Sequence, residues 1–512
     1  PPAADATVAP ARAPGPVAPA PASAPAALPC SARIVVDNPY PQAWGHTACF
    51  ATRADKIVCV LVGLPARGKS YIARRLAQYV TFFYSTPCRV FNIAEYIRRI
   101  TGGDADFSDA AEAQRAQAEE EALADVCDWM DEAIAPKRRK TGQQAQCDTG
   151  GPYVSGEFEF GAVAMYDGTN CTAERRTWLT HKLKPTGAKI IFIETICDDE
   201  DAILRNLLAE RRALGAAELS AAQQREVLQE FQRRIGHYEQ AYESVSETDL
   251  SWIRILRGGS SNQITMHNIK GFLPSRIAQF LMNLNLDRRP FYFTRHGQSE
   301  YNRLGKIGGD SDLTEHGEEY AEALGRWVQG NVKTASDGSP QPARLWTSSL
   351  RRTIRTARHI SHEKVVLPNG LEWVQMRPKR WRNLDEIYAG LCDGMTYEEI
   401  AGQFPEEALA RKADKFEYRY PRGESYSDLI ARLEPLAHEM ERLQQPLVIV
   451  AHQAILRVLY TYLMEGTRTS CPEATIPLNT VIKLTPTAVG CREERFDVVP
   501  KRPGVELDPA SH

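Results

Sequence analysis

The stretch KIVCVLVGLPARGKSYIARRLAQYV, residues 56–80, decides the fold of the first half of the chain. Residues 57–62 form a continuous, largely β-branched run, which is typical of a strand buried on both faces of a parallel sheet. Residues 70–80 have apolar side chains at helical spacing. Between them, GLPARGKS at 63–70 fits G-x-x-x-x-G-K-[ST] in the strand–turn–helix context that the pattern needs. We therefore expect a phosphate-binding turn here.

The residue types of this turn explain how it would hold phosphate. Its glycines let backbone N–H groups curl around an anion, and the following helix directs its positive end to the same point. Lys69 would reach the β/γ oxygens of a nucleotide, and Ser70 would bind Mg²⁺. Asp167 ends the apolar run VAMYD, where parallel sheets collect their ligands. We expect Asp167 to hold the metal or to receive the proton of an acceptor hydroxyl.

Length and composition exclude several classes of protein. A chain of 512 residues predicts two or three domains. The 62 Lys and Arg against 65 Asp and Glu give a net charge of −3, which lacks the basic excess of a nucleic-acid-binding chain. Every apolar run is shorter than the roughly 18–20 residues that cross a bilayer. The eleven cysteines stand singly, which is typical of reduced thiols in the cytosol. We thus expect a cytosolic protein with no nucleic-acid or membrane partner.

A second α/β alternation follows the first. FYFTRHG (291–297), ARLWTSS (343–349) and LVIVAHQ (447–453) each read as a strand that ends in polar residues, with a helical pattern after it. Because parallel strands bring their carboxyl ends to one edge of a sheet, these polar residues are expected to meet.

The polar residues of this half suit phosphoryl transfer through histidine. A neutral imidazole at a strand end, flanked by guanidiniums that neutralise phosphoryl oxygens, can attack phosphorus. A single histidine after a strand is more often structural, so the prediction depends on the whole set. Glu386 would protonate the departing oxygen. The candidate pocket consists of Arg295, His296, Arg352, Glu386 and His452.

These patterns predict four segments. Residues 1–45 form a Pro/Ala-rich lead-in that we expect to be disordered, residues 46–287 the first domain, residues 288–499 the second, and residues 500–512 a tail. The polar insert around 137–161 is expected to be a disordered loop, with a lid as the alternative. Its Arg138-Arg139-Lys140-Thr141 looks like a site for a basophilic kinase, although a basic loop is more often simply solvated.

With both sites in view, residues 55–495 closely resemble the bifunctional 6-phosphofructo-2-kinase/fructose-2,6-bisphosphatase family. The resemblance implies a P-loop NTPase-like parallel-sheet α/β domain followed by a histidine-phosphatase (phosphoglycerate-mutase-like) α/β domain. It also implies synthesis of fructose 2,6-bisphosphate from fructose 6-phosphate and ATP, hydrolysis of the product, and a homodimer. ATP with Mg²⁺ would serve the first domain, and the second would need no cofactor. The segments that carry the resemblance are GLPARGKSYIARRL (63–76), FNIAEYIRR (91–99), YDGTNCTAERR (166–176), RRIGHYEQAYES (233–244), TRHGQSEYN (294–302), KIGGD (306–310), TSSLRRTIRTA (347–357), MTYEEI (395–400), YRYPRGESYSDLIARLEP (418–435) and AHQAILR (451–457).

In the first domain the resemblance implies catalytic roles for Lys69, Asp167 and Cys197, and metal binding by Ser70 and Asp167. A buried cysteine after a strand is otherwise most often a packing residue. Nucleotide binding is implied for Gly63, Leu64, Pro65, Ala66, Arg67, Gly68, Lys69, Ser70, Tyr71 and Asn206, and fructose 6-phosphate binding for Arg98, Arg115, Thr169, Arg175, Arg211, Arg234 and Tyr238.

In the second domain the resemblance makes His296 the nucleophile and Glu386 the proton donor, with Arg295, Arg352 and His452 around the phosphoryl group. Arg411 and Lys415 are four residues apart and would share one face if that stretch is helical. The residues that would bind the bisphosphate are Asn302, Gly308, Tyr397, Arg411, Lys415, Tyr426, Gln453 and Arg457.

The sequence departs from the family at a few positions. Arg211 stands where the family uses a lysine at the kinase substrate site, and its planar fork does not place charge at the same point. Gln298 and Ser70 are milder changes from Glu and Thr. The Arg211 change supports an alternative hypothesis, an enzyme dominated by its phosphatase with a weak or inactive kinase. A non-catalytic sugar-phosphate sensor is a third, which the intact Lys69, Asp167, His296 and Glu386 argue against.

Overall fold

The structure is a computed structural model, and it describes residues 56–102, 112–134, 161–213, 220–258, 261–286, 289–335, 338–367, 370–487 and 490–499. The lead-in, the tail, and the insert at 137–160 with Thr141 lie outside these ranges. The elements of the first half are β1 (Lys56–Val62), α2 (Lys69–Tyr84), β2 (Cys88–Asn92), α3 (Ile93–Thr101), α4 (Glu112–Ile134), β3 (Ala162–Asp167), α5 (Ala173–Leu183), β4 (Lys189–Cys197), α6 (Glu200–Ala213), α7 (Ala221–Gln240), β5 (Ser251–Gly258), β6 (Ser261–His267) and α8 (Phe272–Asn283).

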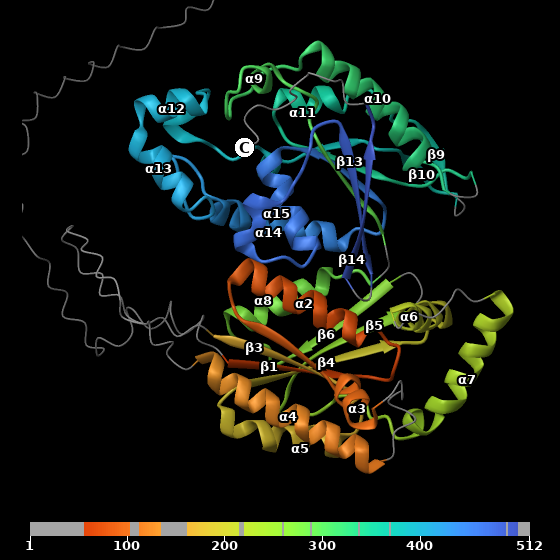
Figure 1. Cartoon of the computed structure of the whole chain (residues 1–512). Coiled ribbons are helices and arrows are strands. Elements are labelled where there is room, and N and C mark those ends of the chain that lie inside the picture. Colours follow the sequence, from red (N-terminus) through yellow and green to blue (C-terminus); the bar gives the residue numbers. More distant parts are fainter. Residues whose placement is uncertain are drawn as a thin grey trace, which may run out of the picture. The chain divides into compact units, whose positions relative to one another are not determined.

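The first sheet has the strand order β2-β3-β1-β4-β5-β6. Neighbouring strands from β2 to β5 pair in parallel, and β6 pairs antiparallel with β5 at the edge. Helices α2 and α8 cover one face, and α3, α4 and α5 cover the other (Figure 1). Because strands β1 and β3 lie side by side, the turn after β1 and Asp167 at the end of β3 meet at the same edge of the sheet.

The central strand β1 shows why the apolar run is continuous. Ile57, Cys59 and Leu61 face the core under α2 and α8, whereas the residues between them face the core under α3, α4 and α5. All of residues 57–62 are fully buried. Side chains alternate between the two faces of a strand, so a strand covered on both faces needs an apolar residue at every position.

The second half contains another mixed sheet, of order β11-β8-β12-β7-β13-β14. Strands β11, β8, β12 and β7 pair in parallel, and β13 pairs antiparallel with both β7 and β14. Its elements are β7 (Phe291–Arg295), α9 (Glu300–Arg303), α10 (Glu315–Asn331), β8 (Arg344–Thr347), α11 (Arg351–Thr356), β9 (Lys364–Val366), β10 (Glu372–Val374), β11 (Pro378–Arg380), α12 (Tyr397–Gln403), α13 (Pro405–Ala413), α14 (Tyr426–Arg442), β12 (Leu447–Ala451), α15 (Gln453–Leu463), β13 (Thr480–Thr487) and β14 (Gly490–Asp497).

Helices cover both faces of this sheet as well. Helices α14 and α15 pack on one face and α10 with α11 on the other (Figure 1). The three central parallel strands β8, β12 and β7 are the three strand-then-site segments of the sequence, so their carboxyl ends bring the predicted phosphatase residues to one edge.

Helix α2 also carries a buried contact to the second half of the chain. The Arg75 guanidinium donates to the Glu441 carboxylate of α14, and the Tyr462 hydroxyl of α15 donates to the same carboxylate at 3.0 Å. A second guanidinium, of Arg289, lies 3.7 Å from Glu441. The charges are only 2% exposed at Arg75, Glu441 and Arg289, and two positive partners hold the pKa of Glu441 below its usual range despite its burial.

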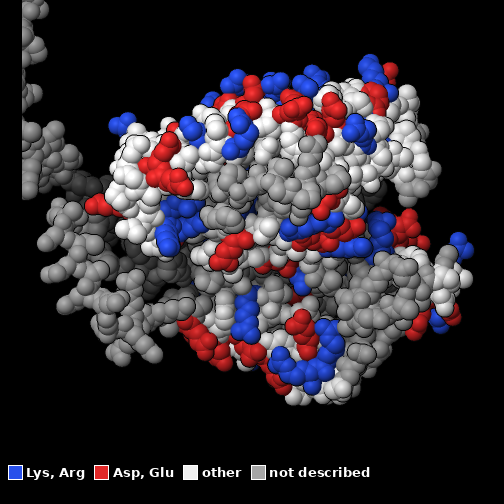
Figure 2. All heavy atoms as spheres, turned by 45° about the horizontal axis from the view of Figure 1, so that its top comes forward, with Lys and Arg blue, Asp and Glu red and all other residues white. Residues whose placement is uncertain are grey.

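Across the described part of the chain, no helix is both long and apolar enough to span a membrane. Figure 2 shows Lys and Arg side chains interspersed with Asp and Glu over the visible described surface. The described surface visible in this view therefore has no broad field of one sign, and an anion bound there would be held by local groups.

Candidate active sites

The phosphate turn closes at the carboxyl end of β1. The Gly63 N–H donates to the Thr169 carbonyl at 2.9 Å, which ties the turn to the loop after β3. Gly63 has φ +139°, and a Cβ there would lie 2.5 Å from the Thr195 carbonyl oxygen, so only glycine fits. Gly68, the N-cap of α2, has φ +87°. The turn is thus directed at the N-terminus of a sixteen-residue helix, as its sequence predicts.

Lys69, Ser70 and Asp167 lie in one cleft. The Lys69 ammonium donates to the Leu64 carbonyl at 2.7 Å, across the turn. Asn92 donates to the Asp167 carboxylate at 2.9 Å. Burial raises the pKa of Asp167, while the Lys69 charge and a hydrogen bond from the Ser70 side chain oppose the rise. A carboxylate and a hydroxyl in contact beside an ammonium form an oxygen-rich site of the kind that Mg²⁺ prefers.

Some of the predicted nucleotide-binding residues line the cleft, and others contact neighbouring elements instead. Asn206 of α6 donates to the Ala66 carbonyl at 2.9 Å, and both residues line the cleft with Gly68 and Tyr71. The Arg67 guanidinium instead pairs with Glu239 of α7 at 3.8 Å. Cys197 is buried at the end of β4.

The candidate sugar-phosphate residues form two groups. Arg98 of α3 lines the cleft with Asp167. Arg115 of α4 donates to the Tyr238 hydroxyl of α7 at 2.5 Å. Arg175 of α5 pairs with Glu119 at 3.0 Å. Positive charge from Arg115 and Arg175 opposes the rise that burial causes in the pKa of Glu119, which places both guanidiniums near one carboxylate.

Arg211 and Arg234 lie on helices α6 and α7, and their side chains are outside what the structure describes. The substrate-binding prediction for these two residues stays a prediction.

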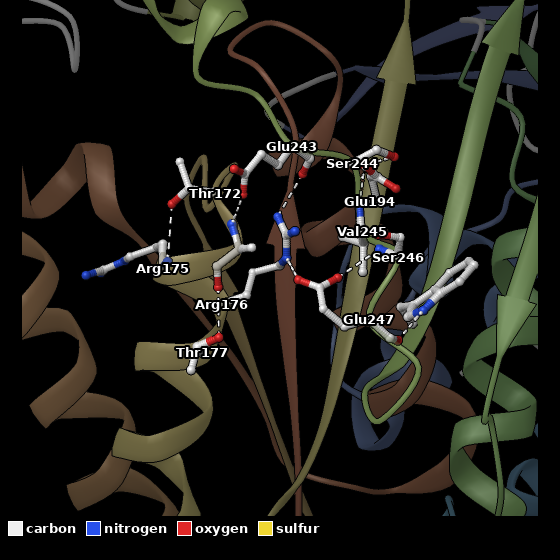
Figure 3. Close-up of polar contacts among 12 residues, drawn as sticks. Thr172, Arg175, Arg176, Thr177, Glu194, Glu243, Ser244, Val245, Ser246 and Glu247 are labelled. Carbon is white, nitrogen blue, oxygen red and sulfur yellow. Dashed lines mark hydrogen bonds and ion pairs between the residues drawn. The ribbon is translucent and has the colours of Figure 1, made fainter.

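The neighbour of Arg175 has a different role (Figure 3). Arg176 is 1% exposed, and its guanidinium donates to the Glu247 carboxylate at 2.7 Å and to the Glu243 carbonyl at 2.9 Å. Glu243 in turn accepts from the Ala173 N–H at 2.6 Å. These bonds join the start of α5 to the segment after α7, the helix that carries Tyr238. Arg176 therefore supports the sugar-phosphate side of the site from behind.

The second site centres on His296, which follows β7 and is 3% exposed. Its Nδ1 lies 2.7 Å from the Gly297 carbonyl oxygen. A carbonyl only accepts, so Nδ1 carries the proton and Nε2 keeps its lone pair. Burial, followed by the charges of Arg352 and Arg295, lowers the pKa of His296 well below its ordinary value. The ring is therefore neutral at neutral pH, and the Nε2 lone pair would be free to attack phosphorus.

Two guanidiniums stand beside this nucleophile. Arg295 and Arg352 are 4% and 3% exposed, and both line the pocket. The Arg352 Nη1 donates to the Gly309 carbonyl at 2.6 Å, which fixes the direction of the fork. The preceding Gly308 has φ +70°, and a Cβ there would collide with the Asp393 carboxylate, so the loop can lie this close only with glycine.

His452 directly follows β12 and is fully buried. Its ring centroid is 5.1 Å from that of His296. The Nε2 atom is 2.8 Å from the Ser348 hydroxyl, whereas buried Nδ1 has no hydrogen-bond partner among the described residues. Burial and the Arg352 charge lower the pKa of His452 well below its ordinary value.

Glu386 lines the same pocket as His296. The Ile387 N–H donates to its Oε1 at 2.9 Å. Desolvation in the pocket raises the pKa of Glu386, and this exceeds the opposing effects of the Ile387 N–H, Arg352 and Arg295. A carboxyl group with a raised pKa keeps its proton to a higher pH than an ordinary glutamate and can deliver it to a leaving oxygen.

The candidate bisphosphate ligands line the same pocket as His296. Arg411 donates to the Tyr397 hydroxyl at 3.0 Å, and Arg457 donates to the Tyr426 hydroxyl at 3.3 Å. Helix α13 ends at Ala413, so Lys415 is not on a helical face shared with Arg411 as the spacing suggests; Asp414 turns the chain by accepting from Phe416 and Glu417. The predicted residues that line the pocket are Arg295, His296, Asn302, Gly308, Arg352, Glu386, Tyr397, Arg411, Lys415, Tyr426, Gln453 and Arg457.

Sequence reasoning missed several residues of the two sites. Lys306 and Tyr301 line the phosphatase pocket. Lys306 stands in the quoted segment KIGGD, whose charge next to glycines was an available signal. Ser348 in the segment TSS follows a strand as His296 does. Glu119 had no signal, because a glutamate on a charged helix is typical of a solvated face.

The fold and these sites define a chain with a P-loop kinase half and a histidine phosphatase half. Models of protein families match residues 46–135 and 154–288 to 6-phosphofructo-2-kinase, and residues 291–498 to the histidine phosphatase superfamily (branch 1). The chain belongs to the 6-phosphofructo-2-kinase/fructose-2,6-bisphosphatase family. It is an enzyme with both catalytic domains of that family.

The first two relatives below agree with this assignment. The chain is 37% identical over 446 residues to 6-phosphofructo-2-kinase/fructose-2,6-bisphosphatase of Aquarana catesbeiana, covering 85% of this chain and 83% of the relative. It is 35% identical over 486 residues to the human enzyme numbered 4, covering 91% and 92%. Among solved structures, a mycobacterial glucosyl-3-phosphoglycerate phosphatase is 25% identical, with a TM-score of 0.33 over 41% of this chain and 98% of its own.

Proposed function

We propose that the first domain transfers the γ-phosphoryl group of ATP to the 2-hydroxyl of fructose 6-phosphate, and that the second domain hydrolyses the resulting 2-phosphate through phosphohistidine. The observation that carries the proposal is the occurrence, in one chain, of a phosphate turn facing Asp167 and a neutral buried imidazole between two guanidiniums.

In the kinase site, turn amides and the Lys69 ammonium stabilise charge on the transferring phosphoryl group. Asp167 accepts a hydrogen bond from the sugar 2-hydroxyl and so orients it. Ser70 and Asp167 would hold Mg²⁺, which when bound supplies charge neutralisation for the nucleotide phosphates. Arg98, Arg115, Arg175 and Tyr238 bind the hexose phosphate, since guanidinium forks match phosphate oxygens.

In the phosphatase site, His296 Nε2 attacks the 2-phosphoryl group, an N–P bond forms, and the P–O2 bond breaks. Glu386 gives its proton to O2 as fructose 6-phosphate leaves. Water then attacks the phosphohistidine, Glu386 accepts its proton, and the N–P bond breaks to release phosphate. Arg295, Arg352 and His452 neutralise or hydrogen-bond the phosphoryl oxygens throughout, and no step requires a metal.

The test uses the whole chain and two labels. Incubation with fructose 2,6-bisphosphate carrying ³²P at position 2, followed by a rapid quench at alkaline pH, should leave one acid-labile label on the peptide that contains His296. Incubation with fructose 6-phosphate and γ-labelled MgATP should yield labelled bisphosphate. Absence of label on His296 would contradict the phosphohistidine route.

A second candidate, a phosphatase-dominant enzyme, is favoured by Arg211 alone. Its test is the ratio of the two turnover numbers in the natural chain and in Arg211→Lys. A kinase turnover that equals the phosphatase turnover, and that Arg211→Lys leaves unchanged, would reject it.

We also propose a homodimer through the kinase domain and a cytosolic location. The edge strand β6 supports the first, because edge strands offer unpaired backbone groups, and its Met266 is 42% exposed. The eight described cysteines, all free thiols, suit a reducing compartment. Light scattering that gives a mass twice that of the chain, and imaging of a tagged chain in cells, test the two statements.

A further inference from the structure

One buried hydroxyl next to the phosphatase pocket has no role in the steps above. Ser348 follows β8 and is fully buried. Its Oγ lies 2.8 Å from His452 Nε2 and 2.8 Å from the Thr353 hydroxyl, and it accepts from the Leu350 N–H at 3.2 Å. A buried hydroxyl destabilises the fold unless it keeps its hydrogen-bond partners.

The two nitrogens of His452 have different surroundings. Nε2 contacts Ser348, while Nδ1 is buried with no hydrogen-bond partner among the residues described. The centroid of the His452 ring lies 5.1 Å from that of the His296 ring. The charges of Arg352 and Arg295 both lower the pKa of His452. Nδ1 is therefore the nitrogen available to a phosphoryl group on His296. Phosphoryl oxygens only accept hydrogen bonds, so a useful Nδ1 must carry a proton.

A neutral imidazole has a single N–H, so a proton on Nδ1 leaves a lone pair on Nε2. That lone pair needs a donor, and the Ser348 O–H is the group within reach. The Leu350 N–H fills one Ser348 lone pair, and the Thr353 O–H can fill the other. The Leu350 carbonyl that Thr353 also contacts accepts from the Thr353 and Ile354 N–H groups as well, so it does not depend on that hydroxyl.

We propose that Ser348 is a positioning residue that holds neutral His452 in the Nδ1–H tautomer, so that His452 donates a hydrogen bond to the phosphoryl group during transfer. The proposal rests on the roles proposed above for His296 and His452. It adds that the ability of His452 to donate a hydrogen bond depends on the Ser348 hydroxyl, which does not itself contact the substrate.

The central experiment compares Ser348→Ala, Ser348→Thr and Ser349→Ala in the full chain. Ser349 is the matched control, since its exposed hydroxyl binds Asp385 and not His452. In Ser348→Ala we expect kcat for fructose 2,6-bisphosphate hydrolysis to fall about 10²-fold, the typical effect of losing one preorganised donor, with KM changed by less than about threefold. Ser348→Thr keeps a donor and should restore most of kcat, and Ser348→Cys is the alternative if the extra methyl group does not fit.

A tautomer measurement separates positioning from simple folding. In protein with ¹⁵N-labelled histidine, with His452→Gln used for assignment, His452 of the natural chain should show a protonated Nδ1 both with and without inorganic phosphate. Ser348→Ala should shift the signals toward the Nε2–H form, while its kinase turnover, the control for an intact chain, stays unchanged.

Two results would overturn the proposal: a kcat in Ser348→Ala within about threefold of the natural chain, or His452 signals that the substitution does not move. The tautomer measurement does not depend on turnover. If the natural chain forms no phosphohistidine at His296, the proposed function fails, while the statement about the His452 tautomer is still tested.

Discussion

The two phosphate sites of this chain solve one problem with different parts of the polypeptide. The candidate kinase site is a turn of eight consecutive residues that offers main-chain amides to an anion at the start of α2, with one ammonium group added. The candidate phosphatase site is assembled from side chains that lie at or after the ends of β7, β8 and β12 and from the loop that carries Glu386. A main-chain site binds an anion delivered by its substrate. A side-chain site can bind the anion and also attack it.

The difference is also electrostatic. In the kinase cleft a cation and a carboxylate lie together. The Lys69 ammonium opposes the rise that burial causes in the pKa of Asp167. In the phosphatase pocket the imidazoles of His296 and His452 are buried next to guanidiniums, and their pKa values are lowered as a result. The first arrangement favours a metal-bound nucleotide, and the second keeps a nucleophile unprotonated.

The largest expected effect comes from removing the nucleophile. His296→Ala should lower bisphosphate hydrolysis by roughly 10⁴-fold or more, because it removes the imidazole that would form the covalent intermediate. Synthesis of fructose 2,6-bisphosphate should remain within about twofold. Lys69→Met is the reciprocal variant and should remove the kinase activity while hydrolysis persists. If either substitution removed both activities, the two sites would not be independent.

The next effect concerns the acid of the second site. Burial raises the pKa of Glu386, so its protonated fraction decreases as pH rises through that value, and kcat of the natural chain should fall on the alkaline side. Glu386→Gln cannot give a proton to O2, and kcat should drop about 10²- to 10⁴-fold. The alkaline decrease should vanish in that variant. A Gln variant that keeps the same pH profile would show that another group is the acid.

These contrasts explain what the sequence could predict. The phosphate turn was predictable because strand, turn and helix are contiguous, and local spacing determines the geometry. The set around His296 was predictable in outline, because Arg295, Arg352 and His452 lie at or just after parallel strands, whose carboxyl ends meet at one edge of the sheet, whereas Glu386 lies in a loop. The residues that support the two sites from outside were not predictable. Ser348 and Glu119 act through partners far away in the sequence, and no periodicity marks them.

Adjacent arginines show the same limit more sharply. Arg175 and Arg176 are the same residue type at adjacent positions, so the sequence does not distinguish them. Arg176 is buried among main-chain and carboxylate acceptors, whereas the Arg175 side chain pairs with Glu119 and is 22% exposed. Only the rotation of α5 against its neighbours separates a candidate ligand from a structural residue. A helix of low amphipathicity does not reveal that rotation in its sequence.

A pair of substitutions tests this division. Arg175→Met should raise KM for fructose 6-phosphate about 10- to 100-fold, as expected for one charge-assisted contact, with little change in the free energy of unfolding. Arg176→Met should lower the free energy of unfolding by about 2–3 kcal/mol, because it removes two hydrogen bonds and takes away the ion-pair partner of Glu247, which keeps the Ser246 N–H. Urea denaturation and kinase assays read out the two effects. Equal effects of both substitutions on KM alone would contradict the structural role of Arg176.

The smallest expected effect lies at the rim of the phosphatase pocket. Desolvation, with the charges of Arg457 and Arg411, lowers the pKa of Lys415 to about 8. Below that pH the ammonium is charged and attracts the bisphosphate; above it the free enzyme loses the charge, so KM should rise about three- to tenfold between pH 7 and pH 9. Lys415→Arg stays charged and should show no such rise, whereas Lys415→Met should show the high KM at every pH. Lys412, exposed on the neighbouring helix α13, is the matched control, and Lys412→Met should follow the natural chain. A rise in KM that persists in Lys415→Arg would assign the pH dependence to another group, and the rim would then bind substrate by its permanent guanidinium charges alone.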